Sequence, residues 1–495
     1  MAKVTKAKNK GALKLVLSYM KPYWALLVLA LIFSTVQIAA TLYAPIVIGN
    51  AIDYIIGADN VNLERVLHNA FILLICIAVV MIFQWLTSLC TNKAAHATVR
   101  DLRCAAFNKL NRVPLETIDS NAHGDLLSRV VNDTDLISDG LIQGFTKLFS
   151  GVVTVVGTLL FMLRLNLTVT LVVVLVTPLS ILVAYFIAHA IHNLFHTQQV
   201  KRGEMSGLAE ELLSGNKIIK AFGRERHVEK QFDELNEELN TVGVKAMFSS
   251  ALTNPCTRFI NGIVYAAVAI VGALIVIKNP AALSVGDLSC FLSYAHQYTK
   301  PFNEITSVIT ELQTATAAAS RVRELLISRE EPADAGLPAL TYCDGSLDIE
   351  HVNFCYDPAR PLIEGLNLHV QPGSRVAIVG PTGCGKTTLI NLLMRFYDPQ
   401  SGKILLSNTP INEITRDSLR GAYGMVLQES WLFNGTVAEN IAYGKPDATR
   451  EEIIDAAKRA HVHGFIEKLQ NGYDTVLGQG VEISQGEQQL LCIAR

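Results

Sequence analysis

Six apolar stretches, each close to the length of about twenty residues that a helix needs to cross a bilayer, dominate the first part of the sequence. Half of the 495 residues are hydrophobic, a share too high for an ordinary soluble enzyme. The predicted spans are Trp24 to Ile48, Val66 to Cys90, Gly144 to Leu163, Leu167 to Ala188, Phe259 to Ile277 and Leu288 to Leu312. These stretches predict an all-α membrane domain of six transmembrane helices over residues 24–328.

The positions of Lys and Arg predict the orientation of these spans. Basic residues are frequent in residues 1–23, in the loop after span two and in the loop after span four. The other loops offer little beyond Arg65, Arg164 and Lys278. Because cytoplasmic loops retain positive charge, we expect a multi-pass protein of the plasma membrane with both termini in the cytoplasm. Residues 1–23 then form a basic cytoplasmic arm and interfacial helix, which we expect to stay attached because its first apolar run does not resemble a signal peptide.

Charge, cysteines and histidines limit the other possibilities. The formal net charge of −2 favours no nucleic-acid partner. The nine cysteines are scattered and predict small buried residues, because no close pair indicates zinc or a disulfide. Where span four ends, His189, His192 and His196 form one face of the predicted helix. It could bind a metal, but interface polarity is the better account because no carboxylate or thiolate lies beside it.

Residues 329–345 predict a linker to a second domain. The two long cytoplasmic loops are typical of helical extensions of the spans, and Pro332, Gly336 and Pro338 then interrupt a polar stretch. From residue 346 onward, β-like runs such as Leu347 to Phe354 and Arg375 to Val379 alternate with helical patterns such as Lys386 to Phe396. We therefore expect an α/β domain over residues 346–495.

The run Gly-Pro-Thr-Gly-Cys-Gly-Lys-Thr-Thr at residues 380–388 has the P-loop pattern, between an apolar strand and a helix. Glycines let the backbone N–H groups face phosphates, and the helix adds the positive end of its dipole. Lys386 would contact the β and γ phosphates, and the Thr387 hydroxyl would bind Mg²⁺. The predicted loop contacts are Gly380, Thr382, Gly383, Cys384, Gly385, Lys386, Thr387 and Thr388. The alternatives are a Gly-rich turn without ligand and, for Cys384, a redox switch in place of a small filler.

With the motifs around this loop, nearly the whole chain resembles the ATP-binding cassette (ABC) exporters, a family of P-loop NTPase domains fused to membrane helices. Val352 to Tyr356 resembles the strand that bears the adenine-stacking aromatic, which makes Tyr356 the candidate and core packing its alternative. Val426 to Gln428 resembles the Q-loop, whose glutamine contacts Mg²⁺ or the attacking water. Trp431 to Thr436 and Glu439 to Ile441 are similar to the run that follows this glutamine in the family.

Ile483 to Glu487 resembles the family's signature motif, which reaches the γ-phosphate bound to the other subunit of a dimer. Ser484 and Gly486 would make that contact, and the alternative is a helix N-cap without a ligand. Glu487 replaces the usual Gln of the motif. Two loop tips, Asp119 to Arg129 and Gly215 to Glu225, resemble those that dock on the cassettes. The loop from Asp474 to Gly480 resembles another contact of the family, but it is one residue short and has Gln479 where an acid is common.

The resemblance implies an ATPase-coupled half-transporter that works as a homodimer or as a heterodimer with a related chain, with ATP and Mg²⁺ as cofactors. It implies export of an amphipathic or hydrophobic small molecule, lipid or peptide by alternating access. The family's Asp-Glu strand end and switch histidine do not occur before Arg495. We therefore expect a cassette that is incomplete at its C-terminus, with Lys386 and Gln428 as its catalytic residues. The alternatives are an ATP-binding regulatory or channel-like membrane protein and an exporter-fold importer of a metal chelate.

Polar residues within the last two spans mark a possible substrate pathway. Span six is interrupted by Ser293, His296, Gln297, Tyr298 and Lys300, and Asn254, Arg258 and Asn261 lie near span five. Tyr294, His296 and Gln297 are the first candidates for mutation. Intramembrane polar groups face a cavity or a neighbouring helix, so helix packing is the alternative to substrate contact. The sequence does not identify the transported molecule.

Overall fold

The computed structural model of the chain describes residues 2–55, 61–279, 282–426, 430–477 and 483–495. Within its helices, the side chains of residues 2–10, 145, 179–181, 183–193, 196, 253–254, 257 and 303–307 lie outside the description. The chain divides into two compact units. The first comprises Met1–Val113 and Thr117–Glu330, and the second comprises Pro114–Glu116 and Glu331–Arg495. The three histidines His189, His192 and His196 therefore fall outside the described side chains.

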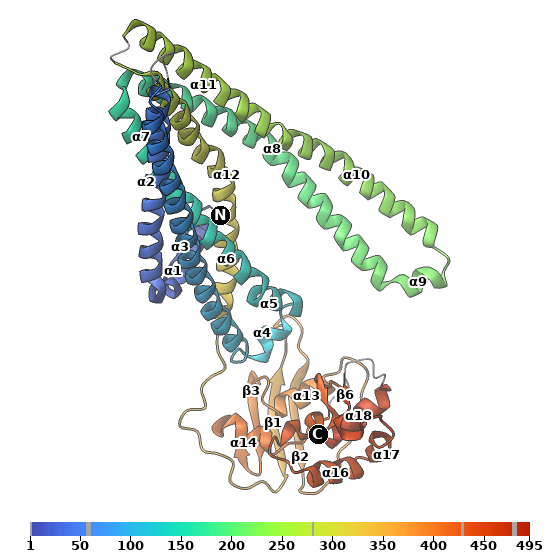
Figure 1. The fold of residues 1–495 in the computed structure, drawn as a ribbon. Coiled ribbons are helices and arrows are strands. Elements are labelled where there is room, and N and C mark those ends of the chain that lie inside the picture. Colours follow the sequence, from blue (N-terminus) through green and yellow to red (C-terminus); the bar gives the residue numbers. More distant parts are fainter. Residues whose placement is uncertain (1, 56–60, 280–281, 427–429, 478–482) are drawn as a thin grey trace. The chain divides into compact units, whose positions relative to one another are not determined.

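The first unit is entirely helical (Figure 1). Its elements are α1 (Ala2–Met20), η1 (Lys21–Tyr23), α2 (Trp24–Asp53), α3 (Leu63–Leu110), α4 (Leu115–Asp119, shared with the second unit), α5 (His123–Val130), α6 (Asn132–Gln143), the π-helix η2 (Gly144–Phe149), α7 (Ser150–Leu165), α8 (Leu167–Ser214), α9 (Asn216–Ala221), α10 (Glu225–Ala251), α11 (Thr253–Lys278) and α12 (Val285–Ile327). Helices α8 and α10 lie side by side and are joined by α9 (Figure 1).

Among the described residues of this unit, four helical stretches are long and apolar enough to cross a membrane. They are Gly11–Asp53, Leu63–Leu110, His123–Leu165 and Arg258–Lys278, and they contain predicted spans one, two, three and five. Predicted span four begins with the apolar helix Leu167–Pro178 and continues into side chains outside the description, as does part of predicted span six in α12. These two spans remain predictions. The predicted extensions of the spans are continuous helices, since the 48 residues of α3 reach about 70 Å at 1.5 Å per residue.

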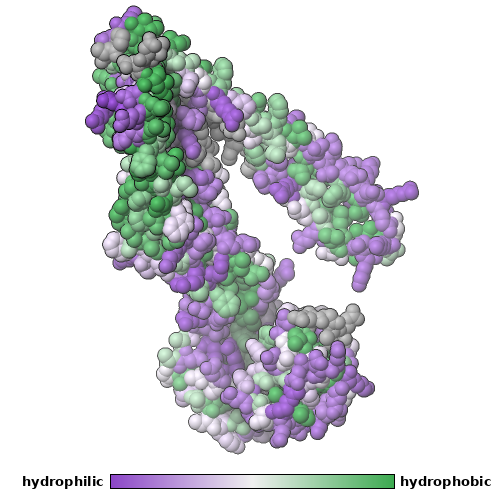
Figure 2. All heavy atoms as spheres, viewed as in Figure 1, coloured by the Kyte–Doolittle hydropathy of each residue, from purple (hydrophilic) through white to green (hydrophobic). Residues whose placement is uncertain are grey.

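The membrane helices expose apolar side chains on their outer faces. In α3 the exposed positions repeat at intervals of three, four and seven residues, as in a stripe along one face of the helix. The stripe consists of Leu67, Phe71, Leu74, Met81 and Trp85. Figure 2 shows hydrophobic residues gathered on the helices of the first unit and a mainly hydrophilic surface on the second. Such a stripe suits contact with lipid.

Helices α2 and α12 approach each other closely at a pair of glycines. A Cβ atom on Gly286 would lie 2.1 Å from the carbonyl oxygen of Gly49, so a larger residue cannot occupy this crossing. The Asp53 carboxylate at the end of α2 accepts hydrogen bonds from the Ser284 hydroxyl at 2.6 Å and the Gly286 N–H at 2.7 Å. The end of α2 and the start of α12 are thereby joined.

The second unit contains a small antiparallel sheet and a helical part. Its elements are β1 (Leu347–Phe354), β2 (Ile363–Val370), α13 (Lys386–Leu393), β3 (Ser401–Leu406), β4 (Thr409–Pro410), η3 (Ile411–Glu413), α14 (Arg416–Gly421), β5 (Gly435–Thr436), α15 (Val437–Ile441), η4 (Ala442–Gly444), α16 (Arg450–Arg459), α17 (His463–Ile466), η5 (Gly472–Asp474), β6 (Val476–Leu477) and α18 (Gln485–Ala494). The sheet order is β2-β1-β3-β4, and β5 pairs with β6 separately.

The predicted strand Leu347 to Phe354 is confirmed as β1, and the predicted helix from Lys386 is confirmed as α13. The predicted strand Arg375 to Val379 is wrong, because no described strand pairs with it and its residues have no regular structure. A strand needs a neighbour to satisfy its backbone groups, and here Val376, Ile378 and Val379 are exposed. The cores form separately around β1 with α13 and around α15 with α16 and α18.

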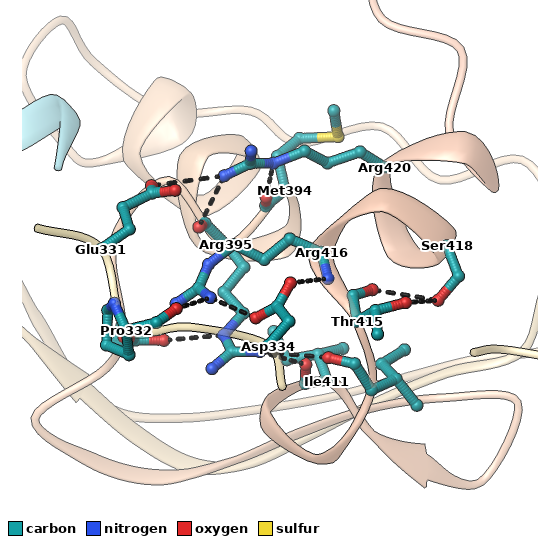
Figure 3. A network of polar contacts seen from close by, with 12 residues as sticks. Glu331, Pro332, Asp334, Met394, Arg395, Ile411, Thr415, Arg416, Ser418 and Arg420 are labelled. Atoms are coloured by element: carbon teal, nitrogen blue, oxygen red, sulfur yellow. Dashed lines mark hydrogen bonds and ion pairs between the residues drawn. The ribbon is translucent and has the colours of Figure 1, made fainter. Parts of the chain in front are cut away.

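The segment predicted as a linker is anchored on the rest of the second unit by a network of polar contacts (Figure 3). Arg416 is buried, and its guanidinium pairs with Asp334 and donates to the Pro332 carbonyl oxygen at 2.9 Å. The Arg416 N–H donates to the Asp334 carboxylate at 2.6 Å. Arg420 pairs with Glu331 at 3.5 Å. From Glu331 onward, the segment therefore belongs structurally to the second unit.

The prediction that the cysteines are buried is correct for only some of them. All nine are free, and Cys76, Cys90 and Cys290 are buried. The prediction of burial is wrong for Cys104, Cys343 and Cys384, which are exposed because they occupy the open face of α3, the linker and the P-loop.

Candidate functional site

The P-loop is a tight turn that ends at the start of α13. Gly383 and Gly385 have φ angles of +85° and +92°, in the left-handed region that a residue with a Cβ atom rarely adopts. A Cβ atom on Gly380 would lie 2.6 Å from the Cys384 sulfur, so the thiol fills the space that this glycine leaves. The predicted contacts Thr382 and Thr387 are exposed, whereas Thr388 is buried.

The first turn of α13 is open to an anion. Gly385 is its N-cap, and no described side chain caps the helix at this end. The first N–H groups of a helix have no partner within the helix, and its dipole makes this end partially positive. Lys386 adds a full positive charge, and its ammonium donates to the carbonyl oxygens of Gly380 and Pro381, both at 2.9 Å. A loop of this shape and charge fits the phosphates of a nucleotide.

Tyr356 lies beside the helix that the P-loop starts. Its ring packs edge-to-face against Phe354 and Tyr397, with centroid distances of 5.0 and 5.1 Å. Asn391 of α13 donates to its hydroxyl at 3.5 Å, yet the side chain remains 51% exposed. Tyr356 is therefore held in place by aromatic neighbours while much of its surface is open for stacking.

Gln428, the predicted Q-loop residue, lies outside the described residues, as does Gln479. The run that follows Gln428 is described and is held by Asn440, a buried residue that sequence reasoning did not single out. Its side-chain amide accepts from the Phe433 N–H at 2.8 Å and donates to the Phe433 carbonyl oxygen at 2.9 Å. The family-like spacing of Phe433 and Asn440 was the signal that could have found this role.

The predicted signature motif forms the capped start of α18. The Ser484 hydroxyl accepts from the Glu487 N–H at 3.3 Å and donates to the Glu487 carboxylate at 2.6 Å. The same carboxylate accepts from the Ser484 N–H at 2.9 Å. These bonds from Ser484 hold the pKa of the Glu487 carboxyl below its ordinary value. Gly486 is exposed, and a Cβ atom there would meet no atom within 4 Å.

The polar residues of the predicted membrane pathway separate into different environments. Tyr294 is fully buried, and its hydroxyl donates to the Leu42 carbonyl oxygen at 2.6 Å, so it joins α12 to α2. Gln297 lines a cavity, and His296 and Arg258 are exposed. Asn261 is half-buried, and the side chain of Asn254 lies outside the description. In the described part of the chain, no three His, Cys, Asp or Glu side chains gather as a metal site.

Two families match the chain, one for each part. Residues 27–302 match the family described as ABC transporter transmembrane region, and residues 363–495 match the family described as ABC transporter. A solved structure titled "Structure of a bacterial Atm1-family ABC exporter with ATP bound" has a TM-score of 0.74 and 28% sequence identity. The match covers 96% of this chain and 83% of that one.

Curated relatives extend the likeness to named transporters. A fatty acid ABC transporter ATP-binding/permease protein of Mycobacterium bovis is 40% identical over 440 residues, which are 89% of this chain and 69% of that protein. An ATP-dependent lipid A-core flippase of Syntrophus aciditrophicus is 32% identical over 404 residues, 80% of this chain and 66% of that protein. The chain thus spans about two thirds of the length of these two relatives.

The two family matches agree with the structural observations for each part of the chain. The apolar helices belong to an ABC membrane region, and the P-loop and capped α18 belong to an ABC nucleotide-binding domain, which binds ATP. The relatives, a transporter named as a permease and a flippase, together with the apolar helices indicate a membrane protein with several spans. The chain is a member of the ABC transporter family, in which a membrane region and an ATP-binding domain are joined in one polypeptide.

Proposed function

We propose that this chain is a half-transporter that uses ATP to export a lipid or another amphipathic or hydrophobic molecule. The observation that carries the proposal is the P-loop with its open helix end in the same polypeptide as helices long enough to span a membrane. The relatives named for fatty acid transport and lipid A-core flipping support a lipid-like substrate.

In this proposal each ATP site combines residues of two chains. Tyr356 stacks on the adenine, and the Gly380 to Thr388 loop surrounds the phosphates. Lys386 neutralises the β and γ phosphates, Thr387 and Gln428 contact Mg²⁺, and Gln428 positions the attacking water. Ser484 and Gly486 of the partner subunit complete the site at the γ-phosphate.

We infer that the functional unit is a homodimer or a heterodimer with a related half-transporter. The region around α9 favours the presence of a partner subunit. At this end of the α8–α10 hairpin, three apolar side chains are exposed, and no described neighbour covers them. They are Leu213, Ile218 and Phe222, with exposed fractions of 76, 66 and 77%. An exposed apolar group of this kind suits an interaction surface. The predicted loop tip Gly215 to Glu225 contains two of these three residues.

The same proposal places the protein in the plasma membrane with its N-terminus and ATP-binding domain in the cytoplasm. It keeps a basic arm at residues 1–23, a membrane domain at 24–328, a linker at 329–345 and the cassette at 346–495. The excess of Lys and Arg in the arm and in the loops after spans two and four supports this orientation.

The test is transport by the full-length protein in proteoliposomes. Fluorescent lipid should move to the other leaflet or the lumen when Mg-ATP is added outside, and Lys386→Ala should abolish this movement. ATP binding without movement against a gradient would favour the regulatory or channel-like alternative. Comparing right-side-out and inverted vesicles, and including a metal chelate as a substrate, would identify an importer.

A further inference from the structure

A cavity of about 290 Å³ lies among α2, α3, α7 with η2, and α12. Its polar lining includes Gln37, Gln84, Lys147, Gln297 and Lys300, and Pro301 also lines it. All of these residues belong to the first unit, and all fall within the predicted spans one, two, three and six. We name this space the lysine cavity.

The charged residues that line the lysine cavity in the described part of the chain are all positive. Lys147 and Lys300 line it, and no Asp or Glu is among its lining residues in the described part of the chain. Neither lysine belongs to an ion pair between described side chains. An ammonium in a membrane span is costly unless an anion or water satisfies it, so intramembrane lysines mark functional sites.

The backbone around both lysines departs from a regular α-helix. Lys147 lies in the π-helix Gly144–Phe149, a conformation that is rare and frequent at functional sites. Pro301 follows Lys300 inside α12 and has no N–H for the carbonyl oxygen of Gln297, four residues earlier. A Cβ atom on Gly151 would lie 3.4 Å from Pro301, an ordinary contact distance, so α7 packs against α12 at this proline. Both irregularities face the same cavity.

The rest of the lining supplies neutral donors and apolar surface. The side-chain amide of Gln37 donates to that of Gln84, which joins α2 to α3 at the cavity wall. Ile38, next to Gln37, and Leu42, one helical turn farther along α2, also line the wall, and both are largely buried. The cavity thus combines two cations and neutral amides with an adjoining apolar surface, an arrangement that fits a molecule with a charged head and a hydrocarbon chain.

We propose that the lysine cavity binds the anionic head group, a carboxylate or phosphate, of an acyl-chain amphiphile. The two ammonium groups contact the head-group oxygens, the Gln37 and Gln297 side chains supply further polar contacts, and the acyl chain lies against Ile38 and Leu42. This inference rests on the proposed function as a lipid exporter and narrows its substrate class to anionic amphiphiles.

Binding can be measured without ATP, which separates this inference from the proposed transport activity. The full-length protein in phosphatidylcholine nanodiscs is titrated with four probes of equal chain length: dodecanoate, dodecyl phosphate, dodecanol and dodecyltrimethylammonium. Isothermal titration calorimetry reports binding, after subtraction of the heats of the same probes titrated into protein-free nanodiscs. A parallel titration in phosphatidylglycerol nanodiscs shows whether a bilayer phospholipid competes for the cavity.

We expect the two anionic probes to bind at least about tenfold more tightly than dodecanol, as charge-assisted hydrogen bonds predict. Lys147→Gln and Lys300→Gln should each reduce this preference, and the double variant should abolish it while dodecanol binding stays unchanged. Lys147→Arg with Lys300→Arg should restore it. Lys278→Gln, at the exposed end of α11, is the matched control and should bind like the wild type.

Equal binding of all four probes by the wild type, or an unchanged anionic preference in the double Gln variant, would overturn the inference. Retained dodecanol binding shows that the double variant is folded. If phosphatidylglycerol competes with the probes, the head group comes from a bilayer lipid. If phosphatidylglycerol does not compete, the ligand is a free acyl anion. If anionic binding is confirmed but ATP moves no probe in proteoliposomes, the proposed export fails while the binding site stands.

Discussion

Two helices of the ATP-binding domain begin in opposite ways. Helix α13 begins at Gly385 with no described side-chain cap and with the positive charge of Lys386 in its first turn. Helix α18 begins at Ser484, whose hydroxyl and N–H are both held by the carboxylate of Glu487. The first end is ready for an anion, and the second already carries one of its own.

This difference means that the two halves of the proposed ATP site need different rearrangements of their hydrogen bonds before they can bind phosphate. The P-loop of one chain needs only to transfer the Lys386 hydrogen bonds from two carbonyl oxygens to phosphate. The signature motif of the partner has to release the Ser484 hydroxyl from Glu487 before that hydroxyl can donate to a γ-phosphate. We expect nucleotide to bind the P-loop first and the capped end of α18 to close on it afterwards.

The largest predicted effect follows removal of the P-loop charge. Lys386→Ala should weaken binding of a fluorescent ATP analogue about tenfold to a hundredfold, since a hydrogen bond to a charged group contributes about 1.5–3 kcal/mol. The measurement is an equilibrium titration of the full-length protein. Lys403→Ala, on the exposed edge of β3, is the control. Unchanged affinity in Lys386→Ala would contradict the role given to this ammonium.

A second prediction compares glycines at the two helix starts. Gly385→Ala should destabilise the P-loop by about 1–2 kcal/mol, because a residue with a Cβ atom is strained at a φ of +92°. Gly486→Ala in the first turn of α18 should be neutral or slightly stabilising, since it meets open space and alanine favours helix. Hydrogen exchange of the amides in α13 and α18 measures both. Equal effects of the two variants would contradict the contrast between the helix ends.

A smaller effect is expected from the cap of α18. Glu487→Gln removes the charge but keeps an acceptor for Ser484, so the ATP concentration for dimerisation should fall by about threefold, within the range for a charge near a helix terminus. Ser484→Ala should raise that concentration because the proposed γ-phosphate contact is lost. Light scattering during an ATP titration measures both. If Glu487→Gln raised the concentration as Ser484→Ala does, the Glu487 carboxylate would assist closure rather than oppose it.

The smallest effect concerns pH. Hydrogen bonds from Ser484 hold the pKa of Glu487 below its ordinary 4.5 in the folded chain, so the folded state favours the carboxylate. The stabilising contribution of the cap is therefore present above pH 4.5 and is lost as the pH falls through the lower folded pKa. The unfolding midpoint of the wild type relative to Glu487→Gln should decline only in that acidic range. A constant difference between pH 3 and 7 would contradict this coupling.

The sequence predicted the elements that depend on local patterns. Apolar length identified predicted spans one, two, three and five, and the Gly and Lys spacing identified the P-loop and the start of α13. The stacking, Mg²⁺ and γ-phosphate roles of Tyr356, Thr387 and Ser484 remain predictions. What the pattern could not predict depends on partners distant in sequence. Tyr294 resembled a pathway residue, but its hydroxyl bonds to Leu42 of α2.

The strand from Arg375 and the linker illustrate the same limit. The apolar run at Val376 to Val379 was strand-like by composition, but a strand forms only where another strand supplies hydrogen bonds. Pro332 and Gly336 are typical of a flexible linker, yet Asp334 between them meets Arg416, a contact that single-sequence patterns do not reveal. The lysine cavity likewise requires residues from five helical elements, α2, α3, η2, α7 and α12, to meet.

The anchoring of the linker fixes where one unit ends and the other begins. Lys109 of α3 pairs with Glu330 at 2.7 Å within the first unit, and Arg420 pairs with the adjacent Glu331 within the second. On this crossing the boundary between the units therefore falls at the single Glu330–Glu331 peptide bond, and each of the two adjacent carboxylates pairs with a cation of its own unit. A residue inserted between Glu330 and Glu331 would leave both ion pairs intact, because each pair lies on its own side of the boundary.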